Sequence, residues 1–385
     1  MARPAPDVSI VTSGHDVADA RLHREVAALH RAGLVVEVLG LGDPAGGPEG
    51  ADVRTRARGS MPARAVRALR LPFAARGRVL LTLDPDVVPA ALVAALVRRR
   101  RLVADVHEDY VALLADRAWV PGPLLRVIRW VARWCVGLAG RATLTVVADD
   151  HVPPRQDRCR RRLVVRNLPD PALLPPGRPV VDEPELRAVY IGDVRTSRGL
   201  RTMIEAVAAA PGWQLDVVGP VAAADAGWLA GRLTGADVAG RVVLHGRMPP
   251  RAAWEIGARA SVGMMLLGRT PAFDDSVPTK LYEYLACGLA VLSTPMPRVA
   301  ALLDGSPAAV LVPEADAASA AAGNAPAAAG NAAVDAAAAA LRAWADRPAE
   351  LAKARAAALE WADRELRGAS PYDALADRVA QLAAR

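Results

Sequence analysis

Residues 8–39 read VSIVTSGHDVADARLHREVAALHRAGLVVEVL, and this stretch decides the fold class. It opens with a β-prone run that ends at Ser13-Gly14, and apolar residues then recur at helical spacing over residues 19–31. Gly33 ends the helical pattern, and residues 35–39 are β-prone again. A strand, a glycine loop, a helix and a second strand in this order predict the opening of a doubly wound parallel α/β sheet.

The same rhythm returns after a segment that is rich in proline. Residues 167–187 contain six prolines, which neither a helix interior nor a central strand tolerates. We therefore expect a Rossmann-like domain over residues 1–166, a linker over 167–187 and a second Rossmann-like domain over 188–368. The two domains are expected to face each other across a cleft at the carboxyl ends of their strands.

Other segments depart from this rhythm. Residues 315–340 repeat Gly-Asn-Ala among alanines, and we expect a flexible low-complexity insertion there. Residues 54–78 are dense in arginine and are expected to form a solvated loop and helix. Residues 124–138 mix Trp, Arg and aliphatic side chains, which fits either an ordinary domain helix or a contact with a membrane surface or lipid acceptor. Residues 369–385 are expected to form a final amphipathic helix.

Charge and cysteine content limit the functional classes. The formal net charge is +7, but nearly every positive charge is an arginine, which we attribute to coding bias rather than to a nucleic-acid partner. Cys135, Cys159 and Cys287 show no disulfide or metal-ligand spacing, so no metal site is predicted. The chain begins without the apolar region of a signal peptide and lacks a membrane-spanning run, so we expect a cytoplasmic protein. Peripheral association with the cytoplasmic face of a membrane remains open.

The strongest local motif is VPTKLYEYLACGLAVL at residues 277–292. Pro278 opens a helix, and the free backbone amides near Thr279 are suited to holding an anion such as a diphosphate. Glu283 lies one turn further on, and Asp275 stands eight positions before it. Two carboxylates that flank a helix start predict a site for a nucleotide sugar.

This pattern resembles that of the family-4-type retaining glycosyltransferases, the glycosyl transferases group 1 of GT-B fold. Their motif places an acidic residue and a Glu with seven residues between them, as Asp275 and Glu283 stand here, although Asp274 could take the first role. The resemblance implies that residues 369–385 cross back to the first domain. It also implies that His107, within the segment DVHEDY, faces the reacting sugar, and that Asp275 acts with it as a catalytic residue.

The resemblance implies further contacts. The segment YIGDVRTSRGL resembles the loop that binds the donor diphosphate, with Arg198 and Arg195 as its basic pair. Residues 244–248 resemble the loop that contacts the nucleotide base. The donor-binding residues expected in this way are Gly14, Arg195, Arg198, Gly246, Arg247, Met248, Ser276, Val277, Pro278, Thr279 and Glu283. Residues expected on the acceptor side are Asp16, Arg21 and Glu108.

The implied reaction moves a hexose-type sugar from a nucleoside-diphosphate sugar to an unidentified acceptor with retention of configuration. Arginines and helix-terminal amides would stabilise the leaving diphosphate, so no metal and no cofactor beyond the co-substrate are expected. Two alternatives remain open. A nucleotide-sugar 2-epimerase has the same fold, and a non-catalytic homologue could serve as a partner subunit. The base, the donor sugar, the acceptor and the oligomeric state are not indicated.

Overall fold

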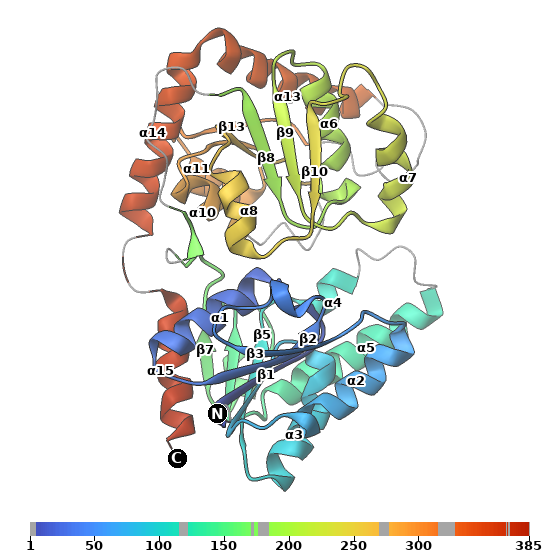
Figure 1. The fold of residues 1–385 in the computed structure, drawn as a ribbon, viewed down its shortest axis with the longest axis vertical. Coiled ribbons are helices and arrows are strands. Elements are labelled where there is room, and N and C mark those ends of the chain that lie inside the picture. Colours follow the sequence, from blue (N-terminus) through green and yellow to red (C-terminus); the bar gives the residue numbers. More distant parts are fainter. Residues whose placement is uncertain are drawn as a thin grey trace. The chain divides into compact units, whose positions relative to one another are not determined.

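A computed structural model describes residues 5–114, 122–170, 173–175, 185–268, 277–314, 328–366, 368 and 370–384. The chain divides into two compact units. Unit 1 comprises Met1–Asp170 with Ala369–Arg385, and unit 2 comprises Pro171–Gly368 (Figure 1). Each unit is a parallel sheet covered by helices on both faces.

The sheet of unit 1 has seven strands in the order β3-β2-β1-β4-β5-β6-β7, and its neighbouring strands pair in parallel. Its strands are β1 (Val8–Asp16), β2 (Val36–Leu41), β3 (Asp52–Arg56), β4 (Val79–Thr82), β5 (Arg101–Val106), β6 (Leu144–Val147) and β7 (Arg162–Val164). The strand order changes direction between β1 and β4. In doubly wound sheets, ligands bind beside the carboxyl ends of the strands at such a switch point.

Alternate side chains along β1 point into two separate cores, as a strand requires. Val8 and Ile10 pack beneath α1 (Ala20–Arg31) and α15 (Pro371–Ala383). Val11 belongs to the core on the other face. That face is covered by α2 (Met61–Ala74), α3 (Val88–Val97) and α5 (Gly122–Ala139), and the shorter helices are η1 (Pro44–Gly46), η2 (Pro85–Val87), α4 (Tyr110–Leu113) and η4 (Gln156–Arg158).

The last helix of the chain belongs to unit 1. α15 packs against α1, and its Tyr372 is fully buried in their shared core. The Tyr372 hydroxyl donates to Asn167 Oδ1 at 3.1 Å, and Arg31 Nη2 lies 2.6 Å from Asp373 Oδ1. A capping box at Ser370 starts the helix. Residues separated by some 200 positions in the sequence are thereby joined in one core.

Unit 2 has a six-stranded parallel sheet in the order β10-β9-β8-β11-β12-β13, which changes direction between β8 and β11. Its strands are β8 (Arg187–Ile191), β9 (Gln214–Val218), β10 (Val242–Gly246), β11 (Val262–Met265), β12 (Ala290–Ser293) and β13 (Ala309–Leu311). Its helices are η6 (Thr196–Arg198), α6 (Leu200–Ala208), α7 (Ala223–Arg232), α8 (Pro250–Gly257), α10 (Thr279–Ala286), α11 (Pro297–Leu303), α13 (Ala328–Asp346) and α14 (Pro348–Glu365).

Parts of the sequence interpretation need correction. The loop expected from residue 54 onward begins within β3, and β7 was not predicted at all. Both are edge strands whose side chains are mostly polar or half-buried, so they lack the apolar alternation that marks a strand. The insertion expected over 315–340 does not extend to 340, because residues 328–346 form α13, while 315–327 lie outside the described residues.

Replacing Gly219 by alanine is expected to lower the free energy of unfolding by more than about 2 kcal/mol. Gly219 has φ 143°, and a Cβ there would lie 1.9 Å from the carbonyl oxygen of Gly192. The matched control is Gly227→Ala within α7, where a Cβ meets nothing within 4 Å. The control should be neutral or stabilising by up to about 1 kcal/mol. Urea unfolding of both variants measures the difference, and equal stability would contradict this account of the loop.

Candidate functional site

Three glycine loops meet at the carboxyl end of the sheet in unit 2. Gly192 follows β8, Gly219 follows β9 and Gly246 ends β10, with φ values of 141°, 143° and 69°. Gly192 N donates to Val218 O at 2.9 Å, and Gly219 N donates to Gly246 O at 2.8 Å. Because these residues carry no side chain, the backbones approach closely and leave peptide groups at the surface of the switch point.

The loop between β8 and α6 is held in place by the end of β11. Gly268 N donates to Ser197 O at 3.0 Å. Gly199 has φ 83°, and a Cβ there would lie 2.1 Å from the carbonyl oxygen of Leu266. Only glycine fits this position, and its backbone conformation turns the chain from η6 into the first turn of α6. The loop therefore presents its basic side chains from a fixed backbone.

The second residue of α10 places a buried lysine against this loop. The Lys280 side chain is 8% exposed, and its Nζ lies 3.9 Å from the centroid of the Tyr190 ring. A Cβ on Gly192 would lie 2.9 Å from Nζ, so the ammonium group rests directly on the loop backbone. Nζ has no hydrogen-bond partner within the described residues. A buried ammonium without a hydrogen-bond acceptor is costly and marks a site that an anion would complete.

The charges around Lys280 act on it in opposite directions. Burial lowers the pKa of Lys280 well below its usual range, and the nearby Arg198 guanidinium lowers it further. The carboxylates of Asp193 and Glu283 oppose this effect. Arg195 Nη2 lies 2.7 Å from Asp193 Oδ2, and both side chains are about two-fifths exposed, at 43% and 40%. Arg195, Arg198 and Lys280 thus form a cluster of basic side chains, of which Lys280 is the most deeply buried.

The start of α10 carries most of the remaining predicted donor residues. Val277 packs against the unit 2 core, Pro278 is the N-cap, and Thr279 is the first helical residue. Glu283 lies one turn further on, half-buried and engaged in polar interaction. The predicted residues Asp275 and Ser276, like Asp274, lie outside the described residues.

The loop predicted to contact the nucleotide base follows β10. His245 Nε2 lies 2.7 Å from Asp216 Oδ1 and ties β10 to β9. The next residues turn away from the sheet at Gly246, whose carbonyl already accepts a hydrogen bond from Gly219. Arg247 is exposed and Met248 is half-buried. The loop after β9 therefore links the other two glycine loops, because Val218 accepts a hydrogen bond from Gly192 and Gly219 donates one to Gly246.

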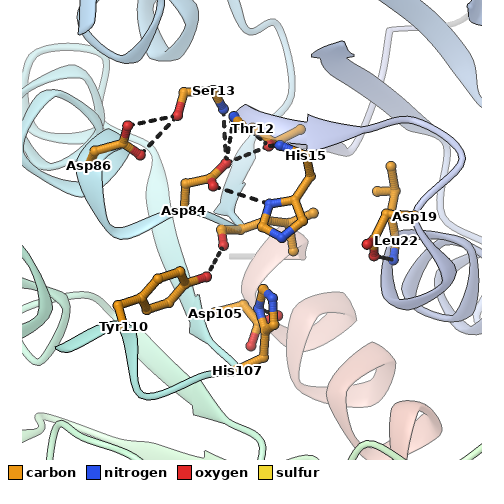
Figure 2. Close-up of polar contacts among 12 residues, drawn as sticks. Thr12, Ser13, His15, Asp19, Leu22, Asp84, Asp86, Asp105, His107 and Tyr110 are labelled. Carbon is orange, nitrogen blue, oxygen red and sulfur yellow. Dashed lines mark hydrogen bonds and ion pairs between the residues drawn. The ribbon is translucent and has the colours of Figure 1, made fainter. Parts of the chain in front are cut away.

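Unit 1 holds a second polar cluster at its own switch point, around Asp84 (Figure 2). The Asp84 side chain is 2% exposed, and its Oδ2 accepts from Thr12 Oγ1, from Ser13 N at 2.9 Å and from Gly14 N at 3.2 Å. Arg64 Nη2 donates to Asp84 Oδ1 at 3.2 Å. One carboxylate at the end of β4 therefore holds the whole loop that follows β1. It also explains Gly14, since a Cβ there would lie 2.7 Å from the Arg64 guanidinium.

His15 is paired with this carboxylate. Its Nδ1 lies 3.1 Å from Asp84 Oδ1, and its ring centroid is 5.2 Å from that of His107 (Figure 2). Burial alone would lower the pKa of His15, but the charge of Asp84 and the hydrogen bond to it outweigh burial and raise the pKa to about 10. The imidazole is therefore a cation at neutral pH and forms an ion pair with the carboxylate.

His107, the residue predicted to face the reacting sugar, lies beside a second buried carboxylate. Its Nδ1 lies 3.3 Å from Asp105 Oδ2, and its side chain is 8% exposed. Arg21 binds both oxygens of Asp105 at 2.5 Å and 2.8 Å, which orients the carboxylate. Burial raises the pKa of the nearby Glu25 well above its usual range, and the charge of Asp105 raises it further, while Arg21, whose Nε lies 3.4 Å from Glu25 Oε1, opposes the shift.

The residues predicted for the acceptor side lie in different surroundings. Arg21 is 3% exposed and its guanidinium binds Asp105. It therefore orients the carboxylate that lies beside His107. Asp16 Oδ1 accepts from Ala18 N at 3.1 Å in the turn before α1. Glu108 is exposed at the edge of the cluster, close enough to add to the pKa of His15.

Lys280, His15 and Asp84 were not predicted as site residues. A signal existed for Lys280, since it is one of two lysines in a chain whose other side-chain cations are arginines. Asp84 and His15 each follow a buried strand at its carboxyl end, where site residues gather in parallel sheets.

Two further properties concern the described residues alone. Within those parts of the chain, no group of three or more His, Cys, Asp or Glu side chains is arranged to hold a metal ion. None of the helices found there combines the length and the apolar character that crossing a bilayer requires.

Comparison with known proteins identifies the fold. A family model described as "Glycosyl transferases group 1" matches residues 185–325. HepE from Anabaena, solved with UDP-glucose, shares 13% identity at a TM-score of 0.63 over 97% of this chain and 98% of that chain. Sucrose-phosphate synthase from Thermosynechococcus elongatus shares 15% identity at 0.62, covering 98% of each chain. WaaG, a glycosyltransferase involved in lipopolysaccharide biosynthesis, shares 15% at 0.60 over 97% and 99%.

No curated protein matches the sequence. The likeness to these structures shows that the chain has the GT-B fold, with two Rossmann-like domains, which confirms the predicted fold. The match over residues 185–325 places the resemblance to group 1 glycosyltransferases in unit 2, where Arg198 and Lys280 lie.

Replacing His15 by glutamine is expected to destabilise unit 1 in a pH-dependent way. The folded pKa of about 10 lies above the unfolded value near 6.5, so the ion pair stabilises fully below about pH 6.5. That contribution is lost as the pH rises towards 10. The difference in unfolding free energy between wild type and His15→Gln, measured in urea, should therefore shrink from pH 6.5 to 9.5.

The matched control for this measurement is His151→Gln. His151 is 41% exposed and lies 3.2 Å from Asp149 Oδ1, an exposed pair that contributes little. A difference for His15→Gln that stayed constant with pH, or matched that of His151→Gln, would contradict the assigned charge.

Proposed function

We propose that this protein is a retaining glycosyltransferase that transfers a hexose-type sugar from a nucleoside-diphosphate sugar to an acceptor hydroxyl. The acceptor is a glycan, a lipid-linked sugar or a small metabolite. The observation that carries this proposal is the cluster of basic side chains at the switch point of unit 2, within the segment that matches group 1 glycosyltransferases. A proposed UDP-sugar donor is supported by the fold's likeness to HepE, which was solved with UDP-glucose.

The donor diphosphate is proposed to bind between the η6 loop and the start of α10. The guanidinium of Arg198 and the ammonium of Lys280 would both face it, and the first amides of α10 add donors that carry no charge of their own. Lys280 lacks a hydrogen-bond partner among the described residues, so the phosphate oxygens would supply the acceptor it needs. An anion there raises the pKa of Lys280, and binding would fully protonate it.

The same cations would serve the reaction itself. When the bond between the anomeric carbon and the phosphate oxygen breaks, negative charge grows on the leaving diphosphate. Arg198 and Lys280 are held by fixed backbone before the reaction, so they stabilise this charge without reorganisation. The acceptor oxygen then bonds to the anomeric carbon on the same face, and its proton passes to the leaving phosphate.

His15 is not proposed to act as a general base. A general base must be unprotonated at the working pH, and the pKa of about 10 keeps His15 protonated. Glu283 is proposed to bind the ribose hydroxyls, and His107, oriented by Asp105, a hydroxyl of the donor sugar. Asp275 is proposed to contact the sugar as well. Neither a metal nor a cofactor besides the donor enters the proposal.

The proposal is tested by calorimetric titration with UDP-, GDP-, ADP- and TDP-sugars. Binding of one donor class is expected, and binding of none would overturn it. Incubation of the bound donor without acceptor separates the alternatives, because a 2-epimerase would release a changed sugar. A partner subunit would bind donor without turnover. The anomeric configuration of the product, read by proton NMR, decides between retention and inversion.

Replacing Glu283 by alanine is expected to weaken donor binding by about 10- to 100-fold, because a charged hydrogen bond to the donor is lost. Calorimetry with the preferred donor measures it. Glu255→Ala on α8 serves as the control, since Glu255 is a 63% exposed carboxylate outside the site. Donor affinity unchanged by Glu283→Ala would rule out the assigned role of α10.

Replacing Lys280 by methionine is expected to weaken donor binding by about 10- to 100-fold without lowering stability. Methionine keeps the apolar stem and removes a buried ammonium that lacks a described hydrogen-bond partner. The comparison is Lys353→Met, which changes the exposed lysine on α14. Calorimetry gives the affinity, and urea unfolding gives the stability. A variant that loses stability but keeps its affinity would show that Lys280 is structural.

A further inference from the structure

One face of unit 1 exposes large apolar side chains in unusual number. Of the fifteen exposed large hydrophobic residues in the described chain, eleven lie on α2, α3 and α5. Among them, Leu96 is 81% exposed, Trp130 64% and Trp134 50%. The full set is Met61, Val66, Leu69, Phe73, Val93, Leu96, Val97, Val127, Trp130, Val131 and Trp134. Single exposed apolar residues are ordinary, but a set concentrated on three helices marks an interaction surface.

These helices form one layer. α3 contacts both α2 and α5, and all three cover the same face of the unit 1 sheet (Figure 1). Their inward sides are small and buried, as with Ala68 on α2, Ala91 on α3 and Ala139 on α5. The larger apolar side chains of the layer consequently lie on its outer side. We call this outer side, with its arginines, the Arg–Trp face.

The Arg–Trp face carries positive charge without acidic residues. α2, α3 and α5 contain no Asp or Glu in residues 61–74, 88–97 and 122–139. Their arginines include Arg70 on α2 and Arg126 and Arg133 on α5, all exposed, and Arg98 and Arg99 follow α3. Within the described chain these five arginines form no ion pair with a carboxylate, although 41 acidic residues occur in the sequence.

We infer that the Arg–Trp face binds the surface of a membrane that contains anionic lipids. Tryptophan prefers the boundary between headgroups and acyl chains, and arginine extends its apolar stem while its guanidinium reaches lipid phosphates. Each arginine near such a surface is attracted by the negative lipid charge. The inference does not depend on the proposed transfer reaction, because it rests on residues outside both polar clusters.

The charge pattern distinguishes this partner from a second copy of the chain. A two-fold dimer places the same patch on both sides of the interface, so the Arg–Trp face would set arginines against arginines. Such a contact buries like charges and is unfavourable. An anionic bilayer offers opposite charge and apolar depth together, which matches both components of the face.

Flotation of the intact protein with lipid vesicles tests the inference. Vesicles of phosphatidylcholine with 30% phosphatidylglycerol are compared with vesicles of phosphatidylcholine alone. Binding to the anionic vesicles is expected, at least about tenfold tighter than to the neutral ones, and it should weaken as salt increases. Absence of binding to anionic vesicles, or equal binding to both, would overturn the inference.

Variants locate the contact. Trp130→Ser with Trp134→Ser is expected to weaken vesicle binding by on the order of tenfold or more. Arg126→Gln with Arg133→Gln should weaken it by about 25-fold, from about fivefold for each charge. Val243→Ser with Leu244→Ser is the matched control, since these residues are 42% and 39% exposed on β10 of unit 2.

Two results would overturn the assignment of this face. One is vesicle binding that the Trp130→Ser, Trp134→Ser variant leaves unchanged. The other is a dimer, seen by light scattering during gel filtration, that the same variant dissociates. Donor binding by the Trp and Arg variants should remain that of the wild type, so failure of the proposed donor site and failure of this inference are told apart.

Discussion

The buried ammonium of Lys280 is the constraint on which the candidate donor site depends. It rests on the Gly192 backbone and the Tyr190 ring, and burial and Arg198 both disfavour its charge. A lysine in such a position has a cost to stability unless an anion completes its surroundings. The glycines around it are consistent with this, since the close backbone approach that they allow is what brings peptide groups and the ammonium together.

The two units use the same position in the sheet in opposite ways. In unit 1, the charges at the switch point are balanced internally, with Asp84 paired to His15 and Asp105 to Arg21. In unit 2, Arg195 is paired with Asp193, whereas Lys280 Nζ has no hydrogen-bond acceptor among the described residues. Paired charges hold side chains in a fixed orientation, whereas a buried polar group without a partner is stabilised when a ligand supplies one. This difference supports the proposal that the anionic co-substrate binds unit 2.

The Arg–Trp face is built by the same packing that forms the core of unit 1. Small residues such as Ala91 and Ala94 let α3 lie close to the sheet, which leaves its larger residues Leu96 and Val97 to the outside. The helix α5 keeps Cys135 and Ala139 buried, so Trp130 and Trp134 cannot reach the core. These side chains are thus exposed because they lie on the helix faces that point away from the sheet.

The sequence by itself determined the fold class, because alternation, helical spacing and glycine positions are local and repeat in both halves. It located inner strands such as β1 and β2, whose apolar residues are buried, and it grouped Arg198, Glu283 and the start of α10 as one candidate site. It did not locate β3 and β7, which owe their pairing to a neighbouring strand at a sheet edge. Only the tertiary structure decided that Lys280 is buried, that Asp84 holds the loop containing His15, and that α2, α3 and α5 share one outer face. These properties depend on residues far apart in the chain. The burial that shifts a pKa, and the packing that leaves a tryptophan exposed, arise only once those residues have packed together.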